Sequence, residues 1–516
     1  MTASTGLVLL MGDVDAIKDY VFESSRLPQI RGASTLLMRC EAEICRAIRA
    51  AGGQVLVARG GFLLAEAPAS QIHRLADEIS RIFASHTITA TMTLAWEDPA
   101  AAPPSPSPSI SDGWAGRLIR ADPSMRAASP NPFSRRVAFL AARLRAAKDS
   151  RSAVPTLETL PFARKCAICA RRNASESLSE SLYLPEGPLP VCPVCAKRHQ
   201  TGREARSGLR RMWRLWHPDF LGQPPQDLEQ LVEGAPHGRL AFIYADGNDI
   251  GRHLMAPRDP QEYQKFSRKI YRGARRAVFE ALGIALRDWR GNFWPFELIN
   301  IGGDDITLLI QARYALPFAL FFLERFHYYT GHTASCAIVI ADHKYPIRYF
   351  EALAADLLKQ AKERAKSGPE PESALSFLWM PEPVAGEEAD LFLRRYQSEE
   401  GGRRLRLTAR PYRLAQAWQL YELALALKNR VTRSQRQQWA EALTRGVLPS
   451  VQFIQYQIAR APAGARPALR ELLERARDLC GSPRGHHLLF WVEEPDGAWA
   501  TAMMDVLEWA ELLESA

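Results

Sequence analysis

An internal duplication of one α/β module is the feature that most constrains how this chain can fold. Each copy reads as a strand, an amphipathic helix, a hairpin with a glycine pair at its turn, a second helix and a final strand. The opening strands are residues 6–11 and 240–245, and the glycine pairs are Gly60-Gly61 and Gly302-Gly303. This alternation of strands and helices predicts an α+β fold with two similar domains.

The hairpin of the second copy carries two adjacent carboxylates. Its turn reads Gly302-Gly303-Asp304-Asp305 and lies between two apolar, β-prone runs, 298–301 and 306–310. Successive side chains of a strand point to opposite faces, so both acids can reach one site only if Asp304 still lies in the turn. There they would suit a magnesium–nucleotide site, because glycine lets a phosphate approach the backbone. A polar tip on a core hairpin is the alternative, since Gly and Asp are common in turns.

An acid also ends the opening strand of the second copy. Asp246 stands there, followed by the run Gly247-Asn248-Asp249. Where this strand lies beside the hairpin, its acid meets Asp304 and Asp305 at one edge of a sheet, as in the palm domains of polymerases. Two Mg²⁺ or Mn²⁺ ions held at such an edge activate a nucleotide hydroxyl and bind the phosphate that it attacks.

Two lysines follow the last strand of the second copy. Lys344 comes shortly after that strand, and Lys362 lies on the next helix. Either side chain could contact a triphosphate. For each, a solvated surface charge is an equally good interpretation.

The first copy lacks the hairpin acids. It keeps Asp13 and Asp15 at the end of its opening strand, but it has Gly60-Gly61-Phe62-Leu63 where the second copy has its two glycines and two aspartates. Without those acids it should not hold two metal ions. It could still bind a nucleotide, and a purely structural copy is the alternative that we favour.

Two CxxC motifs lie between the copies. They are Cys166–Cys169 and Cys192–Cys195, and 22 residues separate them. Four thiolates at this spacing predict a closed tetrahedral site for a structural Zn²⁺ rather than a redox site. Basic residues crowd the same segment: Arg164, Lys165, Arg171, Arg172, Lys197 and Arg198. They could line a phosphate backbone, or they could form a solvated face.

Composition excludes several other classes of protein. The 47% hydrophobic content is ample for folded cores, and the net charge of +9 favours polyanionic partners. The most apolar run, residues 314–323, is about half as long as a membrane span requires. The cysteines do not form a secreted disulfide framework. We therefore expect a cytoplasmic protein without a membrane partner.

The quoted motifs, in this order, resemble a known family. Tandem palm modules, a four-cysteine insertion, Gly302-Gly303-Asp304-Asp305 and a helical C-terminal part are similar to the large subunit of type III CRISPR effector complexes, the CRISPR polymerase family. The stretches that open the two copies, 12–18 and 245–251, also match, as do 342–346 and Ala361-Lys362. The resemblance covers nearly the whole chain.

The resemblance implies a domain plan. It has a degenerate ferredoxin-like palm at 1–97, a Pro/Ser-rich linker and basic helix at 98–153, and a zinc-binding domain at 154–236. A second palm with the active site follows at 237–372, and a helical domain at 373–516 ends the chain. Family members often begin with an HD nuclease domain, but this chain starts directly in the first palm, so we expect no DNA cleavage. Asn248 also departs from the family, which often has Asp there.

The resemblance also implies an activity and its residues. The family makes cyclic oligoadenylates from ATP, triggered by target RNA bound to a guide-RNA complex with the other type III effector subunits. Catalysis would fall to Asp246, Asp304 and Asp305. Nucleotide contacts are expected from Gly302, Gly303, Gly247, Asn248, Asp249, Lys344, Lys362, Asp13, Asp15, Gly60 and Gly61. Two alternatives remain: a catalytically silent RNA-binding scaffold subunit and a stand-alone cyclic dinucleotide synthase.

Overall fold

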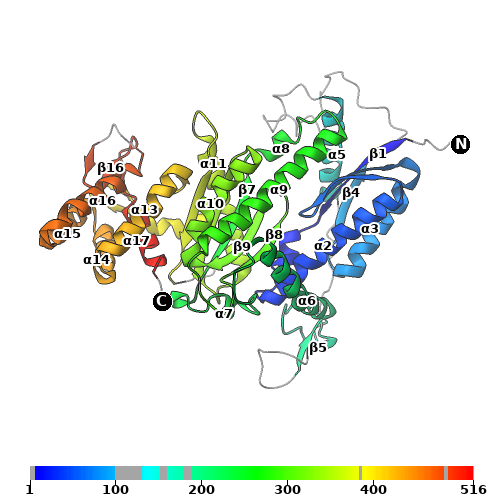
Figure 1. Ribbon diagram of the computed structural model, residues 1–516, viewed down its shortest axis with the longest axis horizontal. Coiled ribbons are helices and arrows are strands. Elements are labelled where there is room, and N and C mark those ends of the chain that lie inside the picture. The colour runs from blue at the N-terminus through cyan, green and yellow to red at the C-terminus, as the bar shows by residue number, and fades with distance from the viewer. Residues whose placement is uncertain are drawn as a thin grey trace. The chain divides into compact units, whose positions relative to one another are not determined.

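The chain divides into two compact units (Figure 1). The computed structural model describes residues 6–98, 131–150, 160–178, 188–382, 386–481 and 486–514. The first unit comprises Met1–Leu215, Asp249–Ala274 and Ile299–Asp305. The second comprises Trp216–Asn248, Arg275–Leu298 and Ile306–Ala516. The hairpin turn at 302–305 therefore belongs to the same unit as the first copy of the module.

The first copy folds into a four-stranded antiparallel sheet with the order β2-β3-β1-β4. Its strands are β1 (Leu7–Val14), β2 (Gln54–Arg59), β3 (Phe62–Pro68) and β4 (Met92–Trp96). Helix α2 (Leu27–Ala50) connects β1 to β2, and α3 (Ile72–Thr87) connects β3 to β4. This βαββαβ order is the ferredoxin-like topology that the sequence predicts.

A further helix, α5 (Pro132–Asp149), also packs on the first sheet. Its apolar stripe, Phe133, Val137, Leu140 and Leu144, is buried with residues of β1, β3 and β4. Asn131 caps the helix by accepting a hydrogen bond from the Ser134 N–H. The sequence predicts this basic helix but gives no sign that it returns to the sheet. Most of the Pro/Ser-rich stretch expected as a linker, residues 99–130, lies outside the described residues.

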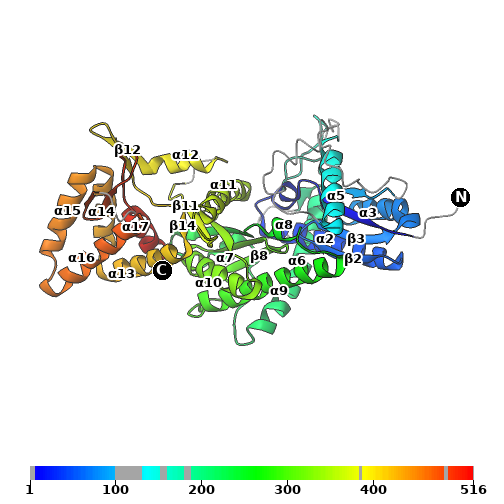
Figure 2. The same ribbon diagram turned by 90° about the horizontal axis from the view of Figure 1, so that it is seen from above.

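The second copy repeats this topology within a six-stranded sheet of order β14-β11-β10-β7-β9-β8. Its strands are β7 (Arg239–Gly247), β8 (Phe296–Ile301), β9 (Ile306–Gln311), β10 (Ala334–Asp342), β11 (Ala374–Trp379) and β14 (Tyr412–Arg413). Its helices are α9 (Pro260–Ala285), α10 (Ala312–Thr330) and α11 (Ile347–Lys366). Helices α10 and α11 lie on opposite faces of the sheet (Figure 2). Because both faces are covered, β9 and β10 are buried along almost their whole length.

The segment between the two copies forms a small cysteine-bearing lobe and a long helix. The lobe contains the hairpin of β5 (Glu176–Leu178) and β6 (Leu189–Val191), and α6 (Pro193–Trp216) follows. Short helices fill the connections: α1 (Ile17–Val21), α7 (Leu228–Leu231) and α8 (Ile250–His253). None of the helices within the described ranges is long and apolar enough to cross a membrane.

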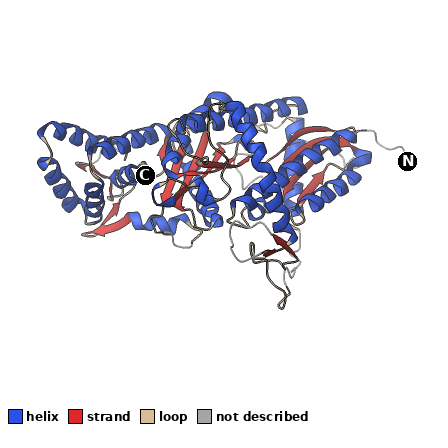
Figure 3. Cartoon of the chain, turned by 60° about the horizontal axis from the view of Figure 1, so that its bottom comes forward, coloured by secondary structure: helices blue, strands red, loops and turns tan. Residues whose placement is uncertain are grey.

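The C-terminal part of the second unit is mainly helical (Figure 3). Its helices are α12 (Ala389–Leu393), α13 (Leu414–Arg430), α14 (Arg433–Thr444), α15 (Val447–Arg460), α16 (Arg466–Asp478) and α17 (Met503–Leu512). A small sheet accompanies them in the order β12-β13-β17-β16-β15. Its strands are β12 (Gln397–Glu400), β13 (Arg403–Arg406), β15 (His487–Leu488), β16 (Trp491–Glu493) and β17 (Trp499–Ala500). The predicted helical character is confirmed, and the sheet is an addition to it.

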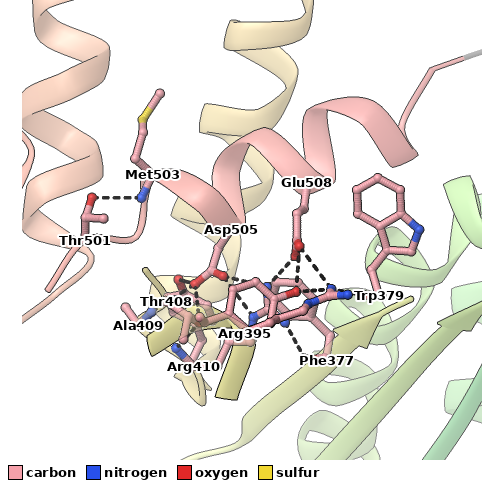
Figure 4. A network of polar contacts seen from close by, with 12 residues as sticks. Phe377, Trp379, Arg395, Thr408, Ala409, Arg410, Thr501, Met503, Asp505 and Glu508 are labelled. Carbon is pink, nitrogen blue, oxygen red and sulfur yellow. Dashed lines mark hydrogen bonds and ion pairs between the residues drawn. The ribbon is translucent and has the colours of Figure 1, made fainter. Parts of the chain in front are cut away.

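A buried ion-pair network joins α17 to the edge of the six-stranded sheet (Figure 4). The Arg410 guanidinium lies 2.7 Å from Asp505 Oδ1 and also pairs with Glu508. Its Nη1 donates to the Phe377 carbonyl of β11 over 2.9 Å. Because the Arg410 and Asp505 side chains are almost fully buried, each depends on the other for compensation of its charge.

Candidate functional site

The two hairpin acids lie in the turn, as a shared site for both of them would require. Strand β8 ends at Ile301 and β9 begins at Ile306, so Asp304 and Asp305 both lie between the strands and are partly exposed. The turn is closed by a hydrogen bond from the Gly302 N–H to the Asp305 carbonyl, 3.0 Å long. Gly303 has φ +155°, which side chains with a Cβ rarely adopt. Neither aspartate is committed to a strand face.

Glycine at position 302 makes room for the Asp305 carboxylate. A Cβ built on Gly302 would lie 2.1 Å from Asp305 Oδ1, well inside contact distance. The other carboxylate oxygen accepts a hydrogen bond from Asn300 Nδ2 over 3.2 Å. The side chain of Asp305 therefore folds back over the turn, and only glycine permits that arrangement.

Asp246 stands at the matching end of the neighbouring strand. Strands β7 and β9 are antiparallel, and their last paired residues at this end are Ala245 and Ile306. Asp246 directly follows the first of these residues along the chain, and Asp305 directly precedes the second. The Asp246 carboxylate forms an ion pair with Lys362 of α11. Chain connectivity thus brings both acids to the same end of one strand pair.

The carboxylates of these aspartates are candidate ligands for a cation. Among the described histidines, cysteines and acids, the one group of three or more whose ligand atoms converge is the cysteine cluster. Carboxylate oxygens are nevertheless the donors that Mg²⁺ prefers. The ammonium group of Lys362 on Asp246 shows that this carboxylate accepts a cationic partner.

The structure separates the two candidate lysines. In the antiparallel pairing of β7 and β10, Asp246 is opposite Ser335, whereas Asp342 is opposite Arg239 at the other end. Lys344 follows shortly after Asp342 and is exposed, and the eight residues from 335 to 342 span roughly 23 Å of strand. Lys344 therefore follows the end of β10 opposite to the end that pairs with Asp246, and its contact with a nucleotide stays a prediction. Helix α11 runs back along the sheet, which explains why Lys362 reaches Asp246 instead.

Asn248 is used inside the second copy. Its Oδ1 accepts a hydrogen bond from Ser335 Oγ over 2.8 Å, and its Nδ2 donates to Thr333 Oγ1 over 3.0 Å. These bonds fix the end of β7 to β10. The neighbouring Gly247 is paired with Ala334, and Asp249 adopts a left-handed conformation before α8. The geometry thus favours a structural role for Asn248 over the nucleotide contact expected from the sequence.

The strand-end acids of the first copy already have protein partners. Asp15 accepts hydrogen bonds from Thr91 Oγ1 at 2.7 Å and Thr93 Oγ1 at 2.6 Å. Lys148 of α5 forms an ion pair with Asp13 and lies 3.6 Å from Asp15. A lysine therefore supplies the positive charge at this position. These contacts favour the structural interpretation of the first copy.

The two glycine-pair hairpins touch each other. Gly60 and Gly61 both have positive φ and form a two-residue turn that pairs Arg59 with Phe62. A Cβ on Gly60 would lie 2.8 Å from the Gly302 Cα. Phe62 thus opens the next strand, whereas Asp304 lies in a longer turn. The two hairpins differ in turn length as well as in their acids.

Sequence reasoning missed three polar residues near these turns. Lys148 lies in a segment expected to be a helix after a linker, and only long-range folding brings it to Asp13. Ser34 and Glu41 lie on α2 and bond to the two hairpins. Burial raises the pKa of Glu41, and the nearby charge of Asp305 acts in the same direction. No local motif distinguishes any of the three from surface residues.

The four cysteines fit a tetrahedral metal site. Their sulfur atoms all lie within 4.8 Å of one another, and Cys169 Sγ is 3.9 Å from Cys192 Sγ. Four thiolates about 2.3 Å from one Zn²⁺ would be separated by roughly 3.8 Å. The Cys195 N–H points to Cys192 Sγ over 3.5 Å, as in a zinc knuckle.

Part of the basic cluster near the cysteines serves the structure. The Glu23 carboxylate is buried and accepts Arg172 Nη2 at 2.8 Å and Arg198 Nη1 at 2.7 Å. Arg172 Nη1 also lies 4.0 Å from Cys169 Sγ. These two arginines tie the cysteine lobe and α6 to the first copy. They are poor candidates to line a phosphate backbone.

Comparison with known proteins agrees with this topology. Residues 239–368 match the family model described as Cas10/Cmr2, second palm domain. The chain therefore contains a segment that resembles the second palm domain of the Cas10/Cmr2 proteins. A search of curated proteins gave no match.

Solved structures of the family share the fold. The Csm1–Csm4 cassette in complex with pppApA aligns at TM-score 0.53 and 15% identity over 98% of this chain and 69% of that chain. The cassette in complex with cA4 aligns at TM-score 0.53 and 16% identity over 98% of this chain and 70% of that chain. Csm1 in T. onnurineus aligns at TM-score 0.52 and 15% identity over 98% of this chain and 70% of that chain. Against the cassette with AMPPNP, the TM-score is 0.43 and the chain spans 54% of that chain's length.

Proposed function

We propose that this chain is a metal-dependent nucleotidyltransferase that converts ATP into cyclic oligoadenylates in type III CRISPR antiviral defence. The 3′-oxygen of one ATP would attack the α-phosphorus of another. The bond from that phosphorus to the pyrophosphate oxygen would break, and the hydroxyl proton would leave. Repetition and a final intramolecular attack would close the ring. Structures of relatives in complex with pppApA, cA3 and cA4 support this substrate class.

The observation that carries the proposal is the position of the acids. Asp304 and Asp305 lie in a turn, and Asp246 ends the strand that pairs with β9 directly after that turn. Together these carboxylates would hold two Mg²⁺ or Mn²⁺ ions, which when bound activate the 3′-hydroxyl and neutralise phosphate charge. Gly302 and Gly303 would leave the backbone open to the triphosphate.

Lys362 would hold the Asp246 carboxylate in place until the nucleotide arrives. Its ion pair with Asp246 keeps the acid compensated in the free protein. Once a triphosphate is bound, the same ammonium group would face an anion of higher charge. No separate protein base is required in this scheme. The four cysteines would hold a structural Zn²⁺ that does not take part in the reaction.

The proposed partners follow from the resemblance to Cas10/Cmr2 proteins. A Csm4-like subunit is the first of them, since the solved relatives are Csm1–Csm4 cassettes. Guide RNA, target RNA and the other type III subunits complete the proposed assembly. The net charge of +9 suits such polyanionic partners.

Mass analysis of the products tests the proposal. The chain, alone and in its target-RNA-bound complex, is incubated with Mg²⁺ and ATP, GTP or both. Cyclic oligoadenylates formed from ATP would support the proposal. No product even from the complete complex would favour a silent scaffold subunit, and a cyclic dinucleotide from the isolated chain would favour a stand-alone synthase.

A further inference from the structure

We propose that helix α2 of the first copy sets the position of the acid-bearing turn, with Ser34 and Glu41 as positioning residues. The inference rests on the proposed function, because it names what holds the catalytic turn. It assigns the acid-free first copy a definite task in the reaction. The contacts that carry it all lie within the first unit.

Ser34 holds the strand that leads into the turn. Its Oγ donates a hydrogen bond to the carbonyl of Ile299 over 2.6 Å, and the pair is buried. Ile299 lies three residues before Gly302. Because the bond joins a helix of one copy to the backbone of the other, it fixes β8 just before the chain turns.

Glu41 holds the hairpin of the first copy. Its Oε1 accepts a hydrogen bond from the Gly61 N–H over 2.9 Å. That amide lies at the tip of the turn, next to Gly60. The Gly60 backbone packs so closely on Gly302 that a Cβ at position 60 would lie 2.8 Å from the Gly302 Cα. The hairpin of the first copy therefore acts as a support against which the catalytic turn rests.

The two contacts come from one rigid element. Ser34 and Glu41 are seven residues apart, so they lie on the same face of α2, about two turns or roughly 10 Å along its axis. A helix of 24 residues keeps that separation constant. One helix thus fixes both the strand entering the catalytic turn and the hairpin that supports it.

Helix α9 holds the supporting hairpin from a second direction. Gln264 Nε2 donates to the Val55 carbonyl of β2 over 2.7 Å. The Arg59 guanidinium lies 3.5 Å from the centroid of the Tyr271 ring. The supporting hairpin is therefore held by two helices and cannot easily move away from Gly302.

A turn of this kind needs outside support. It has four residues between its strands, two of them glycines, so its own backbone restrains it weakly. Metal-binding carboxylates must stay within a fraction of an ångström of their productive positions. A displacement of the turn would therefore lower kcat without weakening the binding of ATP to the same degree.

The test compares variants that keep or remove the Glu41 acceptor of the Gly61 amide and the Ser34 donor to the Ile299 carbonyl. Glu41→Gln keeps an acceptor oxygen for the Gly61 amide, whereas Glu41→Ala and Ser34→Ala remove their bonds. We expect each alanine variant to lower kcat by roughly 10-fold with KM for ATP nearly unchanged, and Glu41→Gln to retain most of kcat. Glu43→Ala on the same helix, whose carboxylate pairs with His86 over 2.9 Å, is the matched control.

A second readout separates this inference from the proposed function. Hydrogen–deuterium exchange of the peptide covering 299–305 should be faster in both alanine variants than in the parent and in Glu41→Gln. If the parent makes no product, the proposed function fails, and exchange alone decides the positioning role. Alanine variants with parental kcat and parental exchange would overturn the inference. So would a Glu41→Gln variant as impaired as Glu41→Ala, because the charge would then matter rather than the hydrogen bond.

Discussion

Lys362 forms an ion pair with Asp246, the acid that ends β7. The first copy contains the same relationship, since Lys148 of α5 pairs with Asp13 at the end of β1. Helices α5 and α11 each follow the fourth strand of their copy and pack on its sheet. The duplicated unit therefore includes a third helix and its lysine. In the copy without hairpin acids, that lysine and two threonines contact the strand-end carboxylates.

We predict that Lys362→Ala lowers kcat/KM for ATP by roughly 10- to 100-fold, since a charge next to phosphate is lost. Initial rates of product formation over a range of ATP concentrations measure the effect. Lys359→Ala is the matched control, because that lysine is exposed on the same helix three residues earlier. Equal rates of product formation for Lys362→Ala and Lys359→Ala would contradict a role for Lys362 in binding the triphosphate.

We predict that Cys192→Ser protein retains less zinc than the parent and unfolds at a lower temperature, because a closed site needs all four thiolates. Metal analysis of the purified proteins and thermal melts measure both effects. Cys45→Ser serves as the control, since that cysteine lies outside the cluster. A parent protein without bound metal would contradict the assignment.

We predict that Arg410→Ala lowers the free energy of unfolding by about 3–5 kcal/mol, since it removes the cation that Asp505 and Glu508 share in the protein interior and leaves Glu508 with Arg395 alone. The pair of Arg404 with Asp496 is exposed, so Arg404→Ala should lower the free energy of unfolding far less. Denaturant titrations followed by tryptophan fluorescence compare the variants. Similar losses in both would show that the network contributes little.

We predict that Glu508→Gln weakens the dependence of stability on pH above pH 4.5. Burial raises the pKa of Glu508 above its ordinary 4.5, although Arg410 opposes the shift. The folded protein thus holds a proton that the unfolded chain releases, so its stability falls as pH rises, by at most about 1.4 kcal/mol per pH unit. Unfolding free energies between pH 4.5 and 7 measure this slope. A slope in Glu508→Gln equal to that of the parent would contradict the prediction.

Local patterns were sufficient for much of the fold and the site. The glycine pair at 302–303 predicted a turn, and Asp304 and Asp305 lie in it. The spacing of the four cysteines predicted a cluster, and their sulfur atoms converge. The order of strands and helices predicted a duplication, and the four-strand order of the first sheet recurs within the six-stranded sheet. In each case the feature depends on short motifs or on the spacing of apolar residues, so it can be predicted from the sequence alone.

The missed features depend on contacts between distant residues. The sequence shows that Lys344 follows a strand, but not at which end of the sheet that strand finishes. Glu41 and Ser34 look like ordinary polar positions on α2. Their roles arise only when the two hairpins fold against this helix, and the residue that Ser34 contacts lies 265 positions away in the sequence. The parallel addition of β11 to β10 likewise has no local signature.

The most direct test of the central claim compares the parent with Asp304→Ala/Asp305→Ala in the complete target-RNA-bound complex. Both proteins are supplied with ATP and Mg²⁺, and their products are quantified by mass spectrometry. The account predicts cyclic oligoadenylates from the parent and a loss of roughly 100-fold or more in the double variant, whose fold and zinc content should be unchanged. A double variant that makes cyclic oligoadenylates at the parental rate would contradict it.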